Sequence, residues 1–422
     1  MAWAIAVLLV EDEPLISALA AEAIPKITEF ACQELANLAW AVASLRIGDV
    51  PLFASISAAS IPRIKDYNFQ DIVNTAWSFA ELRVPNAPLF ASISSAAIRR
   101  LAAAPLAGAG VPKSEDVLGT LHALASIAVP CAPLRAATAA HLGRRAAALD
   151  ARETARAAPP PSGGRNGGGR PEILLAHGGL CILWKPAGWT VSVASGGSSS
   201  AEEEWQQDSS GGLPLQRWLI EEFGADHPIA LDADISHGLL HRLDRQTSGA
   251  LAWAWSYTGY FASRVEFASL RVLKEYVCLC GGWLPRSPCL LEVPLREVRL
   301  GPSKLRSVVH PLGRRACTEV LDIKHLVCQA SGQFSLVAVR LHTGRLHQIR
   351  VHLSDLGYAL LGDAAYGGAT PPWCPRILLH ARRLALGTGD GPIDVPAPWP
   401  QDLREVLALL AAAGGRSRES AG

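Results

Sequence analysis

Residues 1–156 repeat one pattern of apolar and polar positions with a fixed spacing. The segment Ile27–Ser57 matches Ile64–Ser94, and equivalent residues such as Trp40 and Trp77 stand 37 positions apart. Within a unit, apolar side chains recur at helical spacing, and a proline at the same place in each copy opens a second helix. A period of this length predicts an α-helical repeat array, in which each unit buries its apolar face only against its neighbours.

Weaker copies flank these two units. Trp3 stands one period before Trp40, so the array is expected to be incomplete at its start. A degenerate copy follows from Leu118, displaced by eight extra residues. The tryptophans are expected as core side chains, whereas Asn37 and Asn74 are candidates for a recognition face. By its period the array resembles the octatricopeptide-type repeats of organellar RNA-binding proteins.

The composition changes sharply after the array. Residues 157–170 are mostly proline and glycine, which bury little apolar surface, so this segment is expected to be a flexible linker. A strand-like run then opens a second domain at 171–410, and a flexible tail is expected at 411–422. Inside that domain, the polar and acidic stretch 195–212 is expected to form a surface insertion.

Four short blocks in the second domain place polar side chains beside strand-like runs. They are Lys185–Gly188, His241–Gly249, Lys274–Gly281 and Arg340–His352. In the second block, Asp244 stands between two arginines, directly before an apolar run. Positive neighbours keep a carboxyl group ionised, so we expect a nucleophile or a base here. The alternative is a surface turn with a solvated salt bridge.

The third and fourth blocks add an aromatic ring and a basic cluster. Alternation along a strand places Tyr276 on one face with two cysteines, where a tyrosine is more often part of a core. The histidines and arginines around Gln348 predict a local anion site. For a second basic group two interpretations remain, a strip that contacts phosphates and a solvated surface. This group consists of Lys304, Arg306, Arg314 and Arg315.

No motif in the chain predicts a metal or a bound cofactor. The histidines at 342, 347 and 352 are five residues apart, which does not place them on one helical face. The sequence has no GxxxxGK[ST] phosphate loop and no GxGxxG dinucleotide fingerprint after a strand. What remains is a cofactor-free reaction around Asp244.

Composition narrows the class of protein further. With 49% hydrophobic residues the 422-residue chain is not largely disordered, and a net charge of +1 excludes a polycation that coats nucleic acid. Nine scattered cysteines without a CxxC pair are typical of reduced intracellular thiols. No apolar run is long enough to predict a membrane span, and neither a secretory signal nor a transit peptide is visible. Cytosol therefore stays open beside the mitochondrion or chloroplast that the repeats favour.

The order of the blocks, from KPAG through HRLDRQTSG, KEYVCLCGG and LHTGRLHQIRVHL to GDAAYGG and LLHA, resembles the RluA-type family of RNA pseudouridine synthases. The resemblance covers about residues 172–405. It implies an α+β catalytic domain on a mixed, mostly antiparallel sheet, which isomerises uridine to pseudouridine in a structured RNA such as rRNA or tRNA. RNA is thus the expected partner, with no cofactor, no metal and no membrane, and nothing in the sequence demands more than a monomer.

The resemblance also implies roles for single residues. Asp244 corresponds to the catalytic aspartate, Tyr276 to the tyrosine that packs on the target base and serves proton transfer, and Arg345 to the arginine that pairs with the aspartate. Arg242 corresponds to the side chain that fills the space left by the flipped-out nucleotide. The other expected substrate contacts are His241, Thr247, His347, Gln348 and Arg350.

Two features depart from the family pattern, and other functions stay open. Helical repeats stand where an S4-type RNA-binding module is expected, and the 195–212 insertion separates the first two blocks. One alternative is a non-catalytic RNA-binding or scaffold protein that retains the fold, and another makes the repeats a protein-docking array. A glycoside hydrolase is the weakest enzyme alternative, since it needs a second acid at a defined distance.

Overall fold

This computed structural model describes residues 13–105, 111–152, 159–160, 169–192, 213–285, 289–301, 305–328 and 332–415. The expected insertion at 195–212, most of the expected linker, Trp3 and Lys304 lie outside these residues. The chain divides into two compact units. One comprises 1–151 with 264–271, and the other comprises 152–263 with 272–422.

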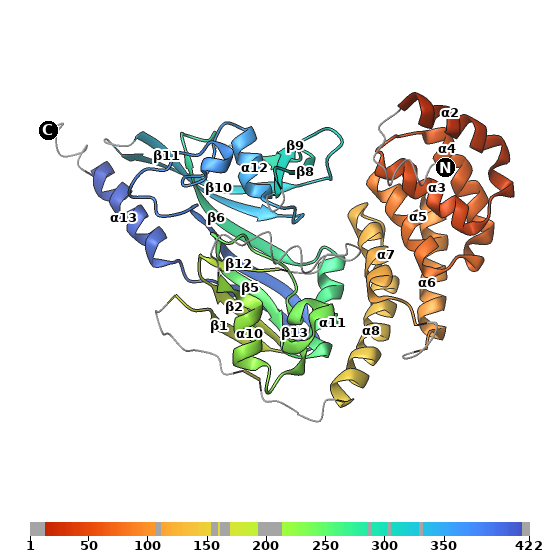
Figure 1. Ribbon diagram of the computed structural model, residues 1–422, viewed down its shortest axis with the longest axis horizontal. Coiled ribbons are helices and arrows are strands. Elements are labelled where there is room, and N and C mark those ends of the chain that lie inside the picture. Colours follow the sequence, from red (N-terminus) through yellow and green to blue (C-terminus); the bar gives the residue numbers. More distant parts are fainter. Residues whose placement is uncertain are drawn as a thin grey trace. The chain divides into compact units, whose positions relative to one another are not determined.

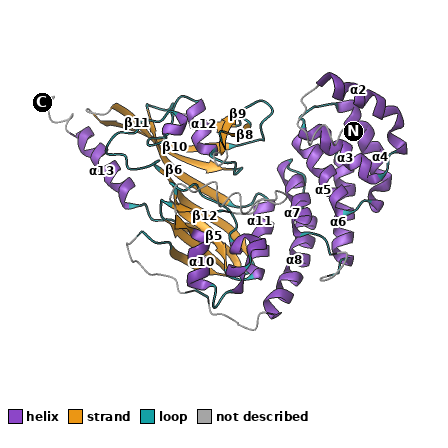
Figure 2. Cartoon of the chain, in the orientation of Figure 1, coloured by secondary structure: helices purple, strands orange, loops and turns teal. Residues whose placement is uncertain are grey.

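The first unit is helical in the part of it that the structure describes, as Figure 2 shows. Two of its elements, η1 and η2, are short 3-10 helices, each with a proline in its first turn. The elements are α2 (Glu13–Ala23), η1 (Ile24–Glu29), α3 (Cys32–Ser44), α4 (Val50–Ser60), η2 (Ile61–Asp66), α5 (Phe69–Glu81), α6 (Ala87–Ala103), α7 (Ser114–Ser126) and α8 (Ala132–Arg152).

The spacing of the sequence pattern reappears in these helices. The helix α3 begins at residue 32 and α5 at residue 69, and α4 begins at residue 50 and α6 at residue 87. Both pairs therefore start 37 residues apart. The next pair, α7 at residue 114 and α8 at residue 132, starts later because of the extra residues. The helices α3, α5 and α7 pack side by side, so successive units share one apolar core.

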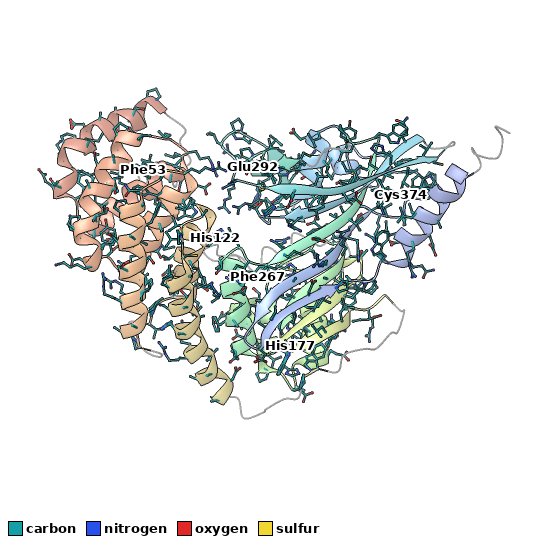
Figure 3. All side chains as sticks on the ribbon, turned by 180° about the vertical axis from the view of Figure 1, so that it is seen from behind. Phe53, His122, His177, Phe267, Glu292 and Cys374 are labelled. Atoms are coloured by element: carbon teal, nitrogen blue, oxygen red, sulfur yellow. The ribbon has the colours of Figure 1, made fainter. Side chains whose placement is uncertain are left out.

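Helix caps and aromatic rings hold this array together. Asn68 and Asp71 form a reciprocal capping box at the start of α5, with hydrogen bonds of 2.8 and 3.1 Å. Asp49 and Asn86 cap α4 and α6 in the same way, each with its side-chain oxygen on a backbone N–H three residues on. The ring of Phe53, labelled in Figure 3, meets that of Phe79 edge to face at 4.8 Å.

The two tryptophans expected in the core occupy a different place. Trp40 and Trp77 are only half-buried, whereas Phe53 and Phe79 are fully buried. Asn37 and Asn74 are half-buried as well, and each lies three residues before its tryptophan. Residues three apart share a helix face, so each Asn–Trp pair forms part of the partly exposed side of its helix.

The second unit is built on a nine-stranded sheet with the order β1-β2-β5-β12-β6-β11-β10-β7, and β13 pairs with β12. Among the described strands of this sheet only β5 and β12 pair in parallel, which confirms the expected mixed, mostly antiparallel sheet. Its strands are β1 (Glu172–His177), β2 (Leu180–Lys185), β5 (Ser248–Ala254), β6 (Leu273–Gly281), β7 (Leu290–Leu291), β10 (Thr318–Cys328), β11 (Gly332–Leu341), β12 (Leu379–Thr388) and β13 (Gly391–Pro396).

Two small ribbons and several helices complete this unit (Figure 1). The ribbons pair β3 (Trp189–Thr190) with β4 (Leu213–Pro214) and β8 (Leu295–Arg299) with β9 (Leu305–Val309). The helices are α10 (Leu215–Phe223), η3 (Pro228–Leu231), η4 (Ala233–Gly238), α11 (Tyr257–Ala268), α12 (Gln348–Asp355), η5 (Ala364–Tyr366) and α13 (Gln401–Gly415), and residues 264–268 of α11 belong to the first unit. Because α13 ends at Gly415, the folded part extends beyond the expected boundary at residue 410.

Alternation along β6 divides the sheet into two faces. Tyr276, Cys278 and Cys280 contribute to the larger core, as their spacing predicts. Val277 and Leu279 contribute to a second core, which α13 covers with its apolar side. The helix α12 lies against β9 and β10, as Figure 1 shows. The sheet thus leaves the side chain of Tyr276 on the face opposite α13.

Candidate active site

Asp244 lies in a tight turn between η4 and β5. The backbone N–H of Thr247 donates to the carbonyl oxygen of Asp244 at 2.9 Å, which closes the turn. Before the turn, Nε2 of His241 accepts a hydrogen bond from the backbone N–H of Ala252 at 3.0 Å. These bonds fold the segment back along β5, so the carboxylate stands at the start of a fully buried strand.

The ammonium group of Lys185 ties this turn to the end of β2. Its Nζ donates to the carbonyl oxygens of Pro186 and Trp189 at 2.9 Å and to that of Arg245 at 3.3 Å. The residue is fully buried, so these carbonyls replace its water. The first sequence block therefore serves to hold the second one in place.

Arg376 ties the same turn to the C-terminal helix. Its Nη1 donates to the carbonyl oxygen of Gln246 at 2.8 Å, and its Nη2 donates to Oγ of Ser248 at 3.1 Å. The same guanidinium forms a two-point ion pair with Asp402 in α13, at 2.5 and 3.1 Å. The side chain of Arg376 is only 8% exposed, so the turn and α13 are joined inside the protein.

Tyr276 reaches the site because β12 pairs with both β5 and β6. His380 of β12 lies opposite Ser248, and the next residue, Ala381, lies opposite Tyr276. The tyrosine is 6% exposed. Burial raises the pKa of Tyr276 above its ordinary value, and the negative charge of Asp244 raises it further. The phenol therefore keeps its proton at neutral pH and presents a ring beside the carboxylate.

Arg350, in the first turn of α12, holds the carboxylate of Asp244. Its Nη1 donates to Oδ2 of Asp244 at 3.3 Å, while Nε and Nη2 form a two-point ion pair with Asp363 at 2.7 and 2.9 Å. Asp363 is 1% exposed. Among the described residues Oδ1 of Asp244 has no hydrogen-bond partner, so one carboxylate oxygen is held and the other is open to a substrate.

The surroundings of Asp244 keep it ionised. Burial alone favours the neutral acid, but the positive charges of His347 in its protonated form, of Arg350 and of Arg242 outweigh it and lower the pKa of Asp244. The surface-turn alternative is therefore wrong, since the turn is anchored and its carboxylate is largely covered. A carboxylate that is ionised, oriented and partly desolvated is suited to act as a nucleophile or as a base.

His347 stands at the N-terminus of α12 with its ring between Asp244 and Tyr366. Its Nε2 lies 4.0 Å from Oδ2 of Asp244, and its Nδ1 lies 3.0 Å from the hydroxyl oxygen of Tyr366. The backbone is left-handed, with φ of 54° and ψ of 22°. Burial lowers the pKa of His347 although Asp244 opposes this, so the ring is mainly neutral at pH 7.

Comparison with known proteins places the chain in a family. Residues 180–355 match the family model described as RNA pseudouridylate synthase. An uncharacterised RNA pseudouridine synthase of Zymomonas mobilis is 33% identical over 39% of this chain and 73% of its own length. The chain belongs to the RNA pseudouridylate synthase family.

Two further relatives are similar over shorter shares of their length. An uncharacterised RNA pseudouridine synthase of Chlorobaculum parvum is 33% identical over 44% of this chain and 63% of its own length. The ribosomal large subunit pseudouridine synthase D of Zymomonas mobilis is 30% identical over 41% of this chain and 56% of its own length. The chain thus spans less than two thirds of either of these two family members.

The arginine that pairs with Asp244 in this family member is Arg350, whereas the sequence motif led us to expect Arg345. Nε of Arg345 donates to the carbonyl oxygen of Arg315 at 3.0 Å. The two arginines are five residues apart in one block, and α12 starts between them. Only the helix, which turns Arg350 inward, distinguishes their roles.

Gln348 has a structural place and does not face the substrate. Its amide nitrogen donates to the carbonyl oxygen of Cys317 and to Oγ1 of Thr318, both at 2.9 Å. Its amide oxygen accepts from Oγ1 of Thr343 at 2.7 Å and from the backbone N–H of Arg345 at 3.0 Å. With 2% exposure and all four hydrogen-bonding sites used, it has none left for RNA.

The remaining expected substrate contacts separate into buried and open residues. Thr247 is 3% exposed and closes the turn with its backbone, and Arg350 is occupied by two carboxylates. Burial and the charge of Lys274 lower the pKa of His241 to about 3, so it serves as a neutral acceptor within the turn. Arg242 is exposed and its charge acts on Asp244, and it stays a predicted substrate contact.

Sequence reasoning missed Lys274 and Asp363. Lys274 lies two residues before Tyr276 on β6 and hence on the same face of the strand. The alternation of the sequence could therefore have predicted it as a neighbour of the site. Burial, together with the positive charge of Arg345, lowers the pKa of Lys274 to about 8. Asp363 belongs to the GDAAYGG block. Its role, to pair with Arg350, is visible only in the structure.

The expected basic strip is only partly open. The guanidinium of Arg306 stacks on the ring of Tyr366 at 4.5 Å, and Arg315 pairs with Glu292 at 3.0 Å. Arg314 is exposed and stays a predicted phosphate contact. Within the described ranges, no group of three His, Cys, Asp or Glu side chains is arranged to hold a metal ion, and no helix is long and apolar enough to cross a membrane.

Proposed function

We propose that this protein isomerises uridine to pseudouridine in a structured RNA, with Asp244 as the reacting carboxylate. The observation that carries the proposal is the arrangement of Asp244 itself. Arg350 orients one carboxylate oxygen and is itself fixed by Asp363, while the other oxygen is open beside Tyr276. This geometry supports a reaction on a flat, neutral base next to a sugar carbon.

The proposed reaction needs neither a redox partner nor a metal. The bond between N1 of uracil and C1′ of the ribose breaks, and a bond between C5 and C1′ forms. C5 loses its proton and N1 gains one, so atoms and electrons balance. Asp244 either attacks C1′ or removes a proton from the sugar, and both routes require an ionised carboxylate.

The base must leave its helix before this carboxylate reaches the sugar. Enzymes that react at a stacked base extrude the nucleotide into a pocket. The buried ring of Tyr276 supplies an aromatic surface for the detached uracil, and aromatic stacking tolerates rotation of the base. The exposed guanidinium of Arg242 is placed to occupy the vacated position in the RNA stack.

The substrate we propose is ribosomal RNA. One similar relative is named a ribosomal large subunit pseudouridine synthase, which supports this class ahead of tRNA. The test is release of tritium from [5-³H]uridine in rRNA and, separately, in tRNA. We expect release from rRNA by the wild type and none by Asp244→Asn, while the matched control Asp390→Asn, changed in an exposed turn, keeps full activity. A wild type that binds RNA without releasing tritium would favour the non-catalytic RNA-binding protein.

The helical unit is proposed to extend the RNA-binding surface. The repeated Asn–Trp pairs on α3 and α5 combine an amide with a partly exposed ring, which suits stacking and hydrogen bonding to unpaired bases. Replacing Trp40 and Trp77 together by leucine should weaken RNA binding about tenfold or more. Unchanged RNA affinity would leave this face to a protein partner.

A further inference from the structure

The hydroxyl group of Tyr366 fixes the tautomer of His347. It donates its single proton to the carbonyl oxygen of Ser307 at 2.9 Å and accepts from the backbone N–H of Ser307 at 3.2 Å. Nδ1 of His347 lies 3.0 Å from the same hydroxyl oxygen. When the hydroxyl donates to Ser307, Nδ1 of His347 is the donor in the contact with Tyr366. This assignment follows from the hydrogen-bond network, and it leaves the lone pair of a neutral ring on Nε2.

Nε2 of His347 is therefore an acceptor that lies beside another acceptor. It stands 4.0 Å from Oδ2 of Asp244, which is too far for a hydrogen bond. The charged side chains that act on the ring are Asp244, Arg350, Asp363 and Arg242. Arg350 directs its donors to the two carboxylates. Among the described residues none donates to this nitrogen, so Nε2 and the carboxylate form a pair of acceptors that suits a donor on the substrate.

The ring is held in this position at a cost. A left-handed backbone is uncommon and strained for a residue other than glycine. The ring of Tyr366 supports it, since it packs edge to face on His347 at 5.7 Å and carries Arg306 and Arg350 at 4.5 and 4.9 Å from its centre. A strained residue held this firmly beside the reacting group indicates a positioned function.

We infer that Nε2 of His347 accepts a hydrogen bond from the 2′-hydroxyl of the target uridine, so that the site selects RNA over DNA. The inference rests on the proposed function. Whether Asp244 attacks C1′ or removes a proton at C2′, its carboxylate must come close to the carbon that bears this hydroxyl or to the carbon next to it. The 2′-hydroxyl is then the nearest donor on the substrate, and DNA lacks it.

The test varies one atom on each side of this contact. Once the modified uridine has been mapped, synthetic RNAs spanning it carry either uridine or 2′-deoxyuridine at that position. Single-turnover rates of isomerisation are measured by nuclease digestion and chromatography. The variant is His347→Asn, because asparagine tolerates the left-handed backbone and its short amide can still reach Tyr366, while the Nε2 acceptor is lost. His342→Gln, at an exposed histidine five residues earlier, is the matched control.

The decisive quantity is the rate on uridine divided by the rate on 2′-deoxyuridine. The intrinsic effect of the missing oxygen on the glycosidic bond is the same for each enzyme and cancels in the comparison. We expect this ratio to be roughly 5- to 100-fold larger for the wild type than for His347→Asn, the usual range for one unsatisfied buried acceptor. His342→Gln should keep the wild-type ratio.

The possible failures are distinguishable. An equal ratio in the wild type and in a folded His347→Asn, with its melting temperature preserved, would show that the histidine acts only as a structural support, and it would overturn the inference while leaving the proposed function intact. A wild type that isomerises neither RNA would remove the proposed function, and the inference with it.

Discussion

The two units of this chain use polar side chains in different ways. In the helical unit, side-chain hydrogen bonds such as that of Asn68 join residues three apart and finish a single helix. In the catalytic unit, Arg350 joins Asp244 across 106 residues of sequence. Loss of a cap therefore frays one helix end, whereas loss of Arg350 leaves a buried carboxylate without its ion-pair partner. The predictions below compare these two kinds of dependence.

The largest effect is expected from Arg350→Met. The change leaves Asp363 buried without its partner, and breaking a buried ion pair in this way costs about 3–5 kcal/mol. Urea denaturation of the catalytic unit measures this loss. The matched variant Arg345→Met should cost less than about 1 kcal/mol. Equal losses would mean that the two arginines share the role assigned to Arg350.

A pH-dependent difference is expected from Lys274. The pKa of Lys274 is about 8 in the folded chain and near 10.5 in the unfolded one, so between these values only the unfolded chain holds the proton. The wild type should therefore gain stability relative to Lys274→Met as pH rises from 8 to 10.5, by at most about 3 kcal/mol. Denaturation curves at several pH values check this. A difference that falls over the same interval would contradict the burial of the ammonium group.

A smaller loss is expected from Gln348→Leu. The side chain is replaced by an apolar one of similar size, which removes the four buried hydrogen bonds of the amide at once, at a cost of about 1–3 kcal/mol. Because Gln348 does not face RNA, KM for the RNA should be unchanged at a temperature where the variant is folded. A raised KM with unchanged stability would show that Gln348 contacts the RNA, as the sequence motif led us to expect.

The smallest effect is expected in the helical unit. Asn68→Ala removes one half of the capping box of α5 and should cost about 1 kcal/mol. Circular dichroism during urea denaturation measures it. Gln70→Ala, on the exposed side of the same helix, is the control and should stay within about 0.5 kcal/mol. A loss above about 3 kcal/mol would mean that caps in the array behave like the network of the catalytic unit.

The same contrast explains what the sequence could predict. The helices of the array could be predicted from the sequence, because they follow from local features. These are the repeat period and the proline at the start of α4 and of α6. The mixed sheet followed from a resemblance of motifs. The assignment of Arg345 failed because the choice between two arginines of one block depends on contacts with Asp363 and Asp244, which lie elsewhere in the chain. Half-buried Trp40 and Trp77 were misjudged for a related reason, since amino-acid type does not reveal which side of a helix finds a neighbour.

The anchoring of the Asp244 turn by Arg376 and Asp402 has a consequence for synthesis of the chain. A polypeptide leaves the ribosome from its N-terminus, so the turn at 241–247 emerges well before its anchors Arg376, just ahead of β12, and Asp402 in α13. The residues of the turn are therefore synthesised before the residues that fix their conformation. Because Arg376 joins the turn to Asp402, the geometry of the turn depends on a helix, α13, that is synthesised after the other residues of the site.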